Sequence, residues 1–148
     1  RCCSSAASDV YKRQVSIKDL NKTDKRESGY CRVKVEGKDL SFYGKKIKTK
    51  NKNFWVYAAN PGKIKKPTNS HPIVQSYVDL FIGGCFQIKE RYKINEFPKQ
   101  CVETTTEWSK HWVNDRVHAR RPFLVPNFYK IDKLLSNYFD YYLENKYQ

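Results

Sequence analysis

Two hydrophobic periodicities occur in this chain, and their order limits the folds that it can adopt. A repeat of two residues, which is typical of a half-buried strand, occurs early, whereas a repeat of three and four residues occurs at the C-terminal end. The C-terminal apolar positions fall on a single helical face: Ile131, Leu134, Leu135, Tyr138, Phe139 and Tyr142. The segment 127–145 is therefore predicted to be an amphipathic helix, with Asn127 as its cap.

The segments before this helix include several predicted strands. Tyr30–Val35 and Phe54–Ala59 have the composition and alternation of strands, and Leu40–Tyr43 is expected to form a hairpin with the first of them. Cys85–Tyr92 and Phe123–Val125 are expected to be two further strands. Strands first and helices later predict an α+β domain. We expect a small, mostly antiparallel sheet or partly open barrel, packed with two or three helices.

Two further segments carry signals for helices. Pro72 opens an apolar stretch that two glycines follow, which predicts either a short helix over 72–82 or a buried strand. Thr104 and Glu107 have the spacing of a capping box, which predicts a helix that begins there and extends to about His118.

The N-terminal segment differs from the rest of the chain. Residues 4–14 read SSAASDVYKRQ, which resembles the in-frame translation of a transposase adapter used to prepare DNA sequencing libraries. We therefore expect 1–14 to be a non-native, disordered segment. Residues 15–148 are expected to form a single small basic domain that lacks part of its N-terminal sequence. The polar stretch 15–28 is expected to be a frayed lead-in or a broken element.

Basic residues are concentrated in the N-terminal half of the chain. Without residues 1–14, the formal net charge falls from +14 to +12. Between Val15 and Lys66 there are 15 lysines and arginines against 5 acidic residues, a net charge of +10, whereas the remainder carries only +2. This asymmetry is typical of a surface that binds a polyanion. The candidates are nucleic acid, an anionic membrane surface and an acidic protein.

The cysteines and the apolar runs indicate the kind of compartment. Without residues 1–14, three cysteines remain: Cys31, Cys85 and Cys101. Their odd number and their spacing argue against a disulfide framework and against a structural zinc site. We therefore expect small buried thiols in a reducing, cytoplasmic compartment. The sequence contains no apolar run of the roughly 18 residues that a membrane span needs.

The connection before Phe54–Ala59 is the main candidate for a binding site. Lysines alternate with other residues along it, so several would project to one side of an extended chain. Lysines neutralise phosphates, and an exposed ring such as Trp55 can stack on an unpaired base. The alternative is a solvated hairpin edge with the rings in the core. The predicted nucleic-acid-binding residues are Lys45, Lys46, Lys48, Lys50, Lys52, Lys63, Lys65, Lys66, Arg120, Arg121 and Trp55.

A second group of residues has the side chains that catalysis requires. His111, Asp115 and His118 stand at i, i+4 and i+7, so they would lie on roughly one face of the predicted helix. Two imidazoles and a carboxylate can bind zinc or iron, or transfer protons at a phosphodiester. The alternative is three polar surface residues. We predict no bound metal or cofactor, and the sequence leaves open whether the protein is an enzyme.

Three segments resemble, in their order, the PUA-like barrels that bind RNA and modified bases. They are the aromatic strand Phe54–Ala59, the strand Cys85–Tyr92 with its tyrosine, and the H-x-R-R-P-F piece from His118 to Phe123. The Gly-Asp turn that usually precedes the central strand is absent, and Gly83-Gly84 stands there instead. The resemblance implies a small barrel fold.

The function predicted from these patterns is a nucleic-acid-binding module that contacts phosphates through lysine-rich loops. Arg116, Arg120 and Arg121, together with His118, form a cluster that could bind a further phosphate, the alternative being plain solvent exposure. Two other functions stay open. One is a metal-assisted nuclease or other hydrolase that uses the His-x3-Asp-x2-His cluster, and the other is a structural or partner-binding fragment without catalysis. RNA and DNA are equally compatible with the pattern.

Overall fold

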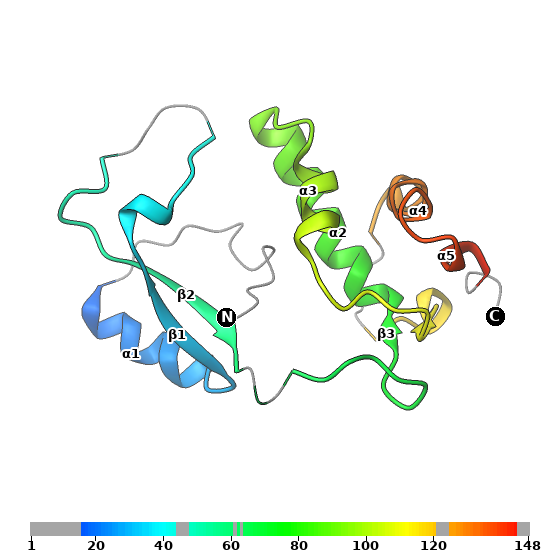
Figure 1. Ribbon diagram of the computed structural model, residues 1–148, viewed down its shortest axis with the longest axis horizontal. Helices are drawn as coiled ribbons and strands as arrows, with labels where there is room; N and C mark the ends of the chain where they lie inside the picture. The colour runs from blue at the N-terminus through cyan, green and yellow to red at the C-terminus, as the bar shows by residue number, and fades with distance from the viewer. Residues whose placement is uncertain (1–15, 44–47, 61, 63, 121–124, 145–148) are drawn as a thin grey trace. The chain divides into compact units, whose positions relative to one another are not determined.

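The computed structural model describes residues 16–43, 48–60, 62, 64–120 and 125–144 (Figure 1). The chain divides into two compact units, unit 1 (Arg1–Ile64) and unit 2 (Lys65–Gln148). The predicted α+β class is confirmed. In the described ranges, helices combine with an antiparallel and a parallel pair of strands, which form open sheets rather than a closed barrel. The sequence predicts that residues 15–148 form a single domain. This would require the two units to associate with each other, and it stays a prediction.

Unit 1 contains helix α1 (Ile17–Arg26) and two antiparallel strands, β1 (Tyr30–Val35) and β2 (Phe54–Ala59). The helix begins where Ser16 Oγ accepts a hydrogen bond from the backbone N–H of Asp19. Such a cap satisfies one of the N–H groups that the first helical turn leaves without a partner. The frayed lead-in predicted for 15–28 is therefore wrong over most of its length.

Strand β1 pairs with β2 rather than with Leu40–Tyr43, so the predicted hairpin partner is wrong. All six residues of β1 have a partner in β2, from Tyr30 opposite Ala59 to Val35 opposite Phe54. A strand of four residues would leave two of them without the cross-strand contacts that stabilise a sheet. After β1 the chain continues into a short 3₁₀ helix, η1 (Gly37–Asp39).

Unit 2 is built around helix α2 (Gln75–Tyr92), against which α3 (Phe97–Thr104) and α4 (Phe128–Ser136) pack. The short strands β3 (Ile73–Val74) and β4 (Trp112–Val113) form a parallel pair. The remaining elements are the 3₁₀ helix η3 (Arg116–His118) and helix α5 (Tyr141–Glu144). The buried core draws on helices α2, α3, α4 and α5 and on strand β4: Val78, Ile82, Cys85, Cys101, Val102, Trp112, Ile131, Leu135 and Tyr142.

Helix α2 continues through Gly83-Gly84, where the sequence predicted a stop. A Cβ atom on Gly83 would lie only 2.9 Å from Val125 Cγ1, so this glycine allows another segment to approach the helix closely. The predicted helix over 72–82 is thus too short, and the strand predicted for Cys85–Tyr92 is wrong. That strand was one of the three segments that carry the resemblance to PUA-like barrels. The helix ends at Tyr92, and the next residue, Lys93, is its C-cap with a φ of 57°.

The apolar face predicted for the C-terminal segment is confirmed, although the helix is in two pieces. The six apolar residues of that face are buried or pack against the core. α4 ends at Ser136 and α5 begins at Tyr141. Asn127 occupies the N-cap position of α4 as predicted, with a φ of 61°, but its side chain makes no capping bond. The strand predicted for Phe123–Val125 lies mostly outside the described residues.

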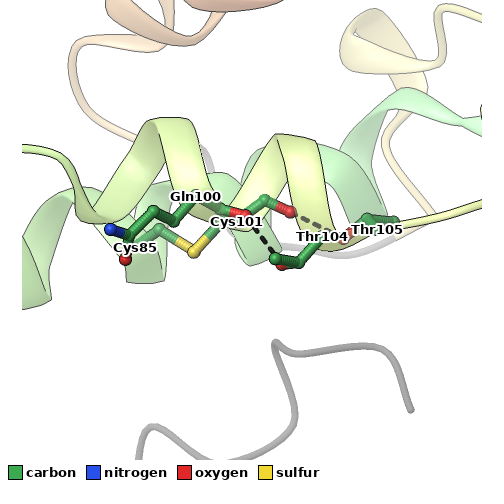
Figure 2. The surroundings of a disulfide bond; sticks show 5 residues. All are labelled: Cys85, Gln100, Cys101, Thr104 and Thr105. Carbon is green, nitrogen blue, oxygen red and sulfur yellow. Dashed lines mark hydrogen bonds between the residues drawn. A yellow bond between two sulfur atoms is a disulfide. The ribbon is translucent and has the colours of Figure 1, made fainter. Parts of the chain in front are cut away.

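A disulfide bond joins Cys85 in α2 to Cys101 in α3 (Figure 2). The packing of the two helices brings these residues to a Cα–Cα distance of 6.7 Å, which is within the range that a disulfide spans. The expectation of buried free thiols is therefore wrong for this pair. Cys31 is a free cysteine, but it is exposed rather than buried.

Thr104 lies at the end of α3 rather than at the start of a helix. Figure 2 shows Thr104 and Thr105 beside the disulfide, where their hydroxyls donate hydrogen bonds to the backbone oxygens of Gln100 and Cys101. The Cys101 carbonyl belongs to the last turn of α3, where the helix itself supplies no backbone N–H for it. The helix predicted to run from Thr104 to His118 is therefore wrong.

Candidate functional site

The β1–β2 pair has two chemically different faces, because directly opposed residues of an antiparallel pair project to the same side. The side that carries charge comprises Tyr30, Arg32, Lys34, Trp55, Tyr57 and Ala59, and we call it the basic–aromatic face. The other side is apolar, and it includes Val33 opposite Val56. On the basic–aromatic face, Arg32 lies opposite Tyr57, and Lys34 lies opposite Trp55.

Asp24 of α1 forms hydrogen bonds with two residues of the basic–aromatic face. Its Oδ2 accepts a hydrogen bond from Arg32 Nη1 at 2.9 Å, and its Oδ1 accepts one from the hydroxyl of Tyr57. Burial and the neighbouring Asp24 carboxylate raise the pKa of Tyr57, which keeps this hydroxyl a donor. The Arg32 guanidinium in turn lies 4.8 Å from the ring centroid of Trp55, a cation–π distance. The Asp24 carboxylate therefore contacts the Arg32 guanidinium, which in turn contacts the Trp55 indole.

The lysines predicted to bind phosphate include three that the structure describes in the connection before β2. Lys48, Lys50 and Lys52 are exposed, and they surround a turn in which Lys52 N–H donates to Thr49 O at 3.1 Å. Asn51 occupies the turn with a φ of 61°. The sequence predicted that these lysines line one side of an extended chain. That prediction is wrong for Lys48, Lys50 and Lys52, because they surround a turn. The predicted site residues Lys45, Lys46, Lys63 and Arg121 lie outside the described residues.

Three further predicted binding residues belong to unit 2. Lys65 and Lys66 are exposed at the start of that unit, and Arg120 is exposed after η3. The backbone N–H of Arg120 donates to Asp115 Oδ2 at 2.8 Å, which holds the chain at this point while the side chain stays exposed. These three cationic side chains thus add exposed positive charge to unit 2.

Asp115, which the sequence proposed as a catalytic or metal-binding residue, caps helix α2. Its Oδ1 accepts a hydrogen bond from the Ser76 backbone N–H at 2.8 Å, and its Oδ2 accepts one from Ser76 Oγ at 2.7 Å. Val74, at the capping position of the helix, has no side-chain capping bond of its own. Burial opposes the charge of Asp115, but the hydrogen bonds from Arg120 and Ser76 outweigh it and lower the pKa of this carboxyl.

The two predicted catalytic histidines do not share a helix face with Asp115. His111 immediately precedes β4, and its Nδ1 lies within hydrogen-bond distance of Asn69 Oδ1. His118 ends η3 and is exposed. In the part of the chain that the structure describes, no group of three or more His, Cys, Asp or Glu residues could hold a metal ion.

Arg116 lies at the centre of a polar network that the sequence did not predict. Its guanidinium donates two hydrogen bonds of 2.7 Å to Asp79, and two more, of 3.1 and 2.8 Å, to Asp132. Both carboxylates are buried. The Tyr142 hydroxyl donates to Asp132 Oδ1 at 2.6 Å, and Gln75 Nε2 donates to Asp79 Oδ1 at 2.7 Å. The network therefore links η3 to α2, α4 and α5.

The electrostatics of this network suit structural linkage rather than anion binding. Burial disfavours the charge of Arg116, but the hydrogen bonds with Asp79 and Asp132 outweigh it and raise the pKa of the guanidinium. Burial and the bond to Asp132 raise the pKa of Tyr142. Arg116 is thus engaged by two carboxylates. Its predicted part in an arginine cluster for phosphate is wrong, whereas Arg120 stays exposed.

Two features thus stand out in the described ranges: an exposed basic–aromatic face in unit 1 and an enclosed ion-pair network in unit 2. No described helix is both long enough and apolar enough to cross a membrane. The chain matches no protein-family model, no curated protein and no solved structure.

Proposed function

We propose that the protein binds nucleic acid, with cationic side chains of unit 1 contacting phosphates. The observation that carries this proposal is the exposure of Lys34, Lys48, Lys50 and Lys52 in the unit that also holds the exposed indole of Trp55. The net charge of +10 over residues 15–66 supports it, because a phosphate backbone attracts such a surface by releasing its counterions.

Further cationic residues belong to the same proposal. Lys65, Lys66 and Arg120 would supply a second patch in unit 2, because their side chains are exposed. Lys45, Lys46, Lys63 and Arg121 would add to these contacts by virtue of their charge and their place in the sequence. An anionic membrane surface or an acidic protein would satisfy the charge, but neither offers the flat bases that an indole ring can stack on.

The test is the salt dependence of binding, measured by fluorescence anisotropy with a labelled oligothymidine of about 20 nucleotides. The wild-type protein should bind at low salt, and the logarithm of its affinity should fall linearly with the logarithm of salt concentration. Replacing Lys48, Lys50 and Lys52 together by Gln removes three charges. This change should weaken binding and reduce the slope by about 2 for a single strand.

The matched control removes three charges from unit 2 instead. Lys99, Lys110 and Lys133 are also exposed, so their joint replacement by Gln produces the same change in net charge. This control should leave the slope nearly unchanged. Equal losses in the two triple variants would mean that net charge alone attracts the oligonucleotide, and no binding by the wild-type protein at low salt would refute the proposal.

The other functions predicted from the sequence stay predictions. A hydrolase that uses His111, Asp115 and His118 would need Asp115 to act while it also caps α2. Metal analysis of the purified protein and an activity assay of the His111→Ala variant test that alternative. A cytoplasmic location also stays a prediction, and the Cys85–Cys101 disulfide bears on it, because disulfides persist mainly in oxidising compartments.

A further inference from the structure

Trp55 differs from the other tryptophans of the chain in its surroundings. Trp108 and Trp112 stack on each other in unit 2 with ring centroids 5.6 Å apart, and Trp112 is buried in the core. Trp55 lies on a strand, and 39% of its surface stays exposed. A partly exposed indole lacks some of the stabilisation that full burial would provide. Burial alone therefore does not explain why a tryptophan occupies this position on the basic–aromatic face.

The contacts around Trp55 restrain its ring in a position where a flat ligand can stack on it. Asp24 binds Arg32, and Arg32 lies over the Trp55 ring at 4.8 Å from its centroid. The ion pair keeps the guanidinium in place, and the contact restrains the indole on that side. Lys34 lies opposite Trp55 in the strand register and is exposed. A ring that is already restrained loses less conformational entropy when a ligand binds to it.

We propose that the basic–aromatic face is a stacking platform for single-stranded nucleic acid, on which an unpaired base stacks against Trp55 while Lys34 and Arg32 contact the flanking phosphates. This inference rests on the proposed nucleic-acid function and adds the class of nucleic acid to it. In a duplex the bases are already stacked on one another and their flat faces are covered. The platform therefore selects strands whose bases are unpaired.

Charge complementarity decides between this occupant and an apolar one. The apolar side of the β1–β2 pair, with Val33 and Val56, would suit a hydrophobic partner, whereas the side with Trp55 carries two cations within one strand. A nucleotide supplies both an anionic phosphate for the cations and a flat ring for the indole. A hydrophobic peptide would offer no anion to Lys34, whereas Arg32 would keep its ion pair with Asp24.

The experiment compares three probes of equal length with the full protein: an oligothymidine, its abasic counterpart and a duplex. The abasic strand has the same phosphates but no bases, so it isolates the phosphate contacts. Wild-type protein should bind the oligothymidine about 5- to 100-fold more tightly than the abasic strand. Trp55→Ala should abolish this difference and leave the affinity for the abasic strand nearly unchanged.

The matched control is Tyr92→Ala in unit 2. Tyr92 is also an exposed ring beside an arginine, with Arg91 5.6 Å from its centroid. This variant should preserve the full difference between the oligothymidine and the abasic strand. If wild type binds both strands equally, or binds the duplex more tightly than the single strand, the stacking platform is refuted, although phosphate binding stands. Binding to none of the probes would refute both proposals.

A second measurement covers the case in which Trp55→Ala does not fold. Trp55→Phe keeps an aromatic ring, so the variant should bind the oligothymidine within a few-fold of wild type. Stacking quenches indole emission, and the remaining tryptophans lie within unit 2. The quenching that the oligothymidine causes in wild type should therefore disappear in Trp55→Phe. Persistence of that quenching would overturn the assignment of Trp55 as the stacking ring.

Discussion

Arg116 and Arg120 lie four residues apart, yet their surroundings give them opposite roles. The Arg116 side chain is almost enclosed and binds both Asp79 and Asp132. The Arg120 side chain is exposed, and it is the backbone N–H of this residue that binds Asp115. Charge and position in the sequence do not distinguish the two arginines, because the difference comes from carboxylates that are distant along the chain.

This contrast leads to a prediction about stability. Arg116→Ala should lower the free energy of unfolding by about 3–5 kcal/mol, because it leaves two buried carboxylates without their cation. Arg120→Ala should change it by less than about 0.5 kcal/mol, because only exposed side-chain atoms are removed. Urea denaturation followed by circular dichroism measures both values. Similar small losses in the two variants would show that the buried carboxylates adapt by taking up protons or water.

At the scale of the secondary-structure elements, tertiary contacts set the limits of helix α2. Two consecutive glycines usually indicate the end of a helix, because glycine costs about 1 kcal/mol relative to alanine in a helix interior. The helix continues here because its close contact with Val125 needs a residue without a side chain at position 83. A Cβ on Gly84, by contrast, would meet no atom within 4 Å. Of the two glycines, Gly83 is the one that packing requires.

The two glycines therefore form a matched pair for mutation. Gly84→Ala should raise the free energy of unfolding by about 0.5–1 kcal/mol, because it restricts the unfolded chain and meets no obstacle in the helix. Gly83→Ala should lower it by about 1–3 kcal/mol, because its Cβ would crowd Val125. Thermal unfolding of the two variants should shift in opposite directions, and shifts in the same direction would contradict this assignment.

At the scale of the whole molecule, the two units differ in how they are stabilised. The hydrophobic core and the Cys85–Cys101 disulfide both belong to unit 2. In the described part of unit 1, Ala58 is the only buried apolar residue, and Val33 stays 38% exposed. Because burial of apolar surface is the main source of stability, the two units should not resist unfolding equally.

Hydrogen–deuterium exchange followed by mass spectrometry tests this difference. Backbone amides of β1 and β2 should exchange faster than those of α2, α3 and α4, because unit 1 has less buried apolar surface to lose on opening. Adding the oligothymidine should slow exchange in β1 and β2 and leave α2 as it was. Equal protection of both units in the free protein would mean that they unfold as one cooperative domain.

The sequence by itself determined the elements whose signals are local. Tyr30–Val35 and Phe54–Ala59 are strands as predicted, and the C-terminal apolar face packs on the core as predicted, because each pattern repeats within a few residues. Two local signals were overlooked: the Ser16-x-x-Asp19 spacing that starts α1, and the isolated Asp79 within an apolar run.

For the candidate site, the sequence predicted the types of residue but not their neighbours. It identified Trp55 and the lysines before it, but the pairing of β1 with β2 brought Arg32 and Lys34 to the same face as Trp55. Only the tertiary structure decided that Asp115 caps α2 and that Cys85 bonds to Cys101. These partners are separated by many residues, and a local pattern carries no information about which distant segment will approach it.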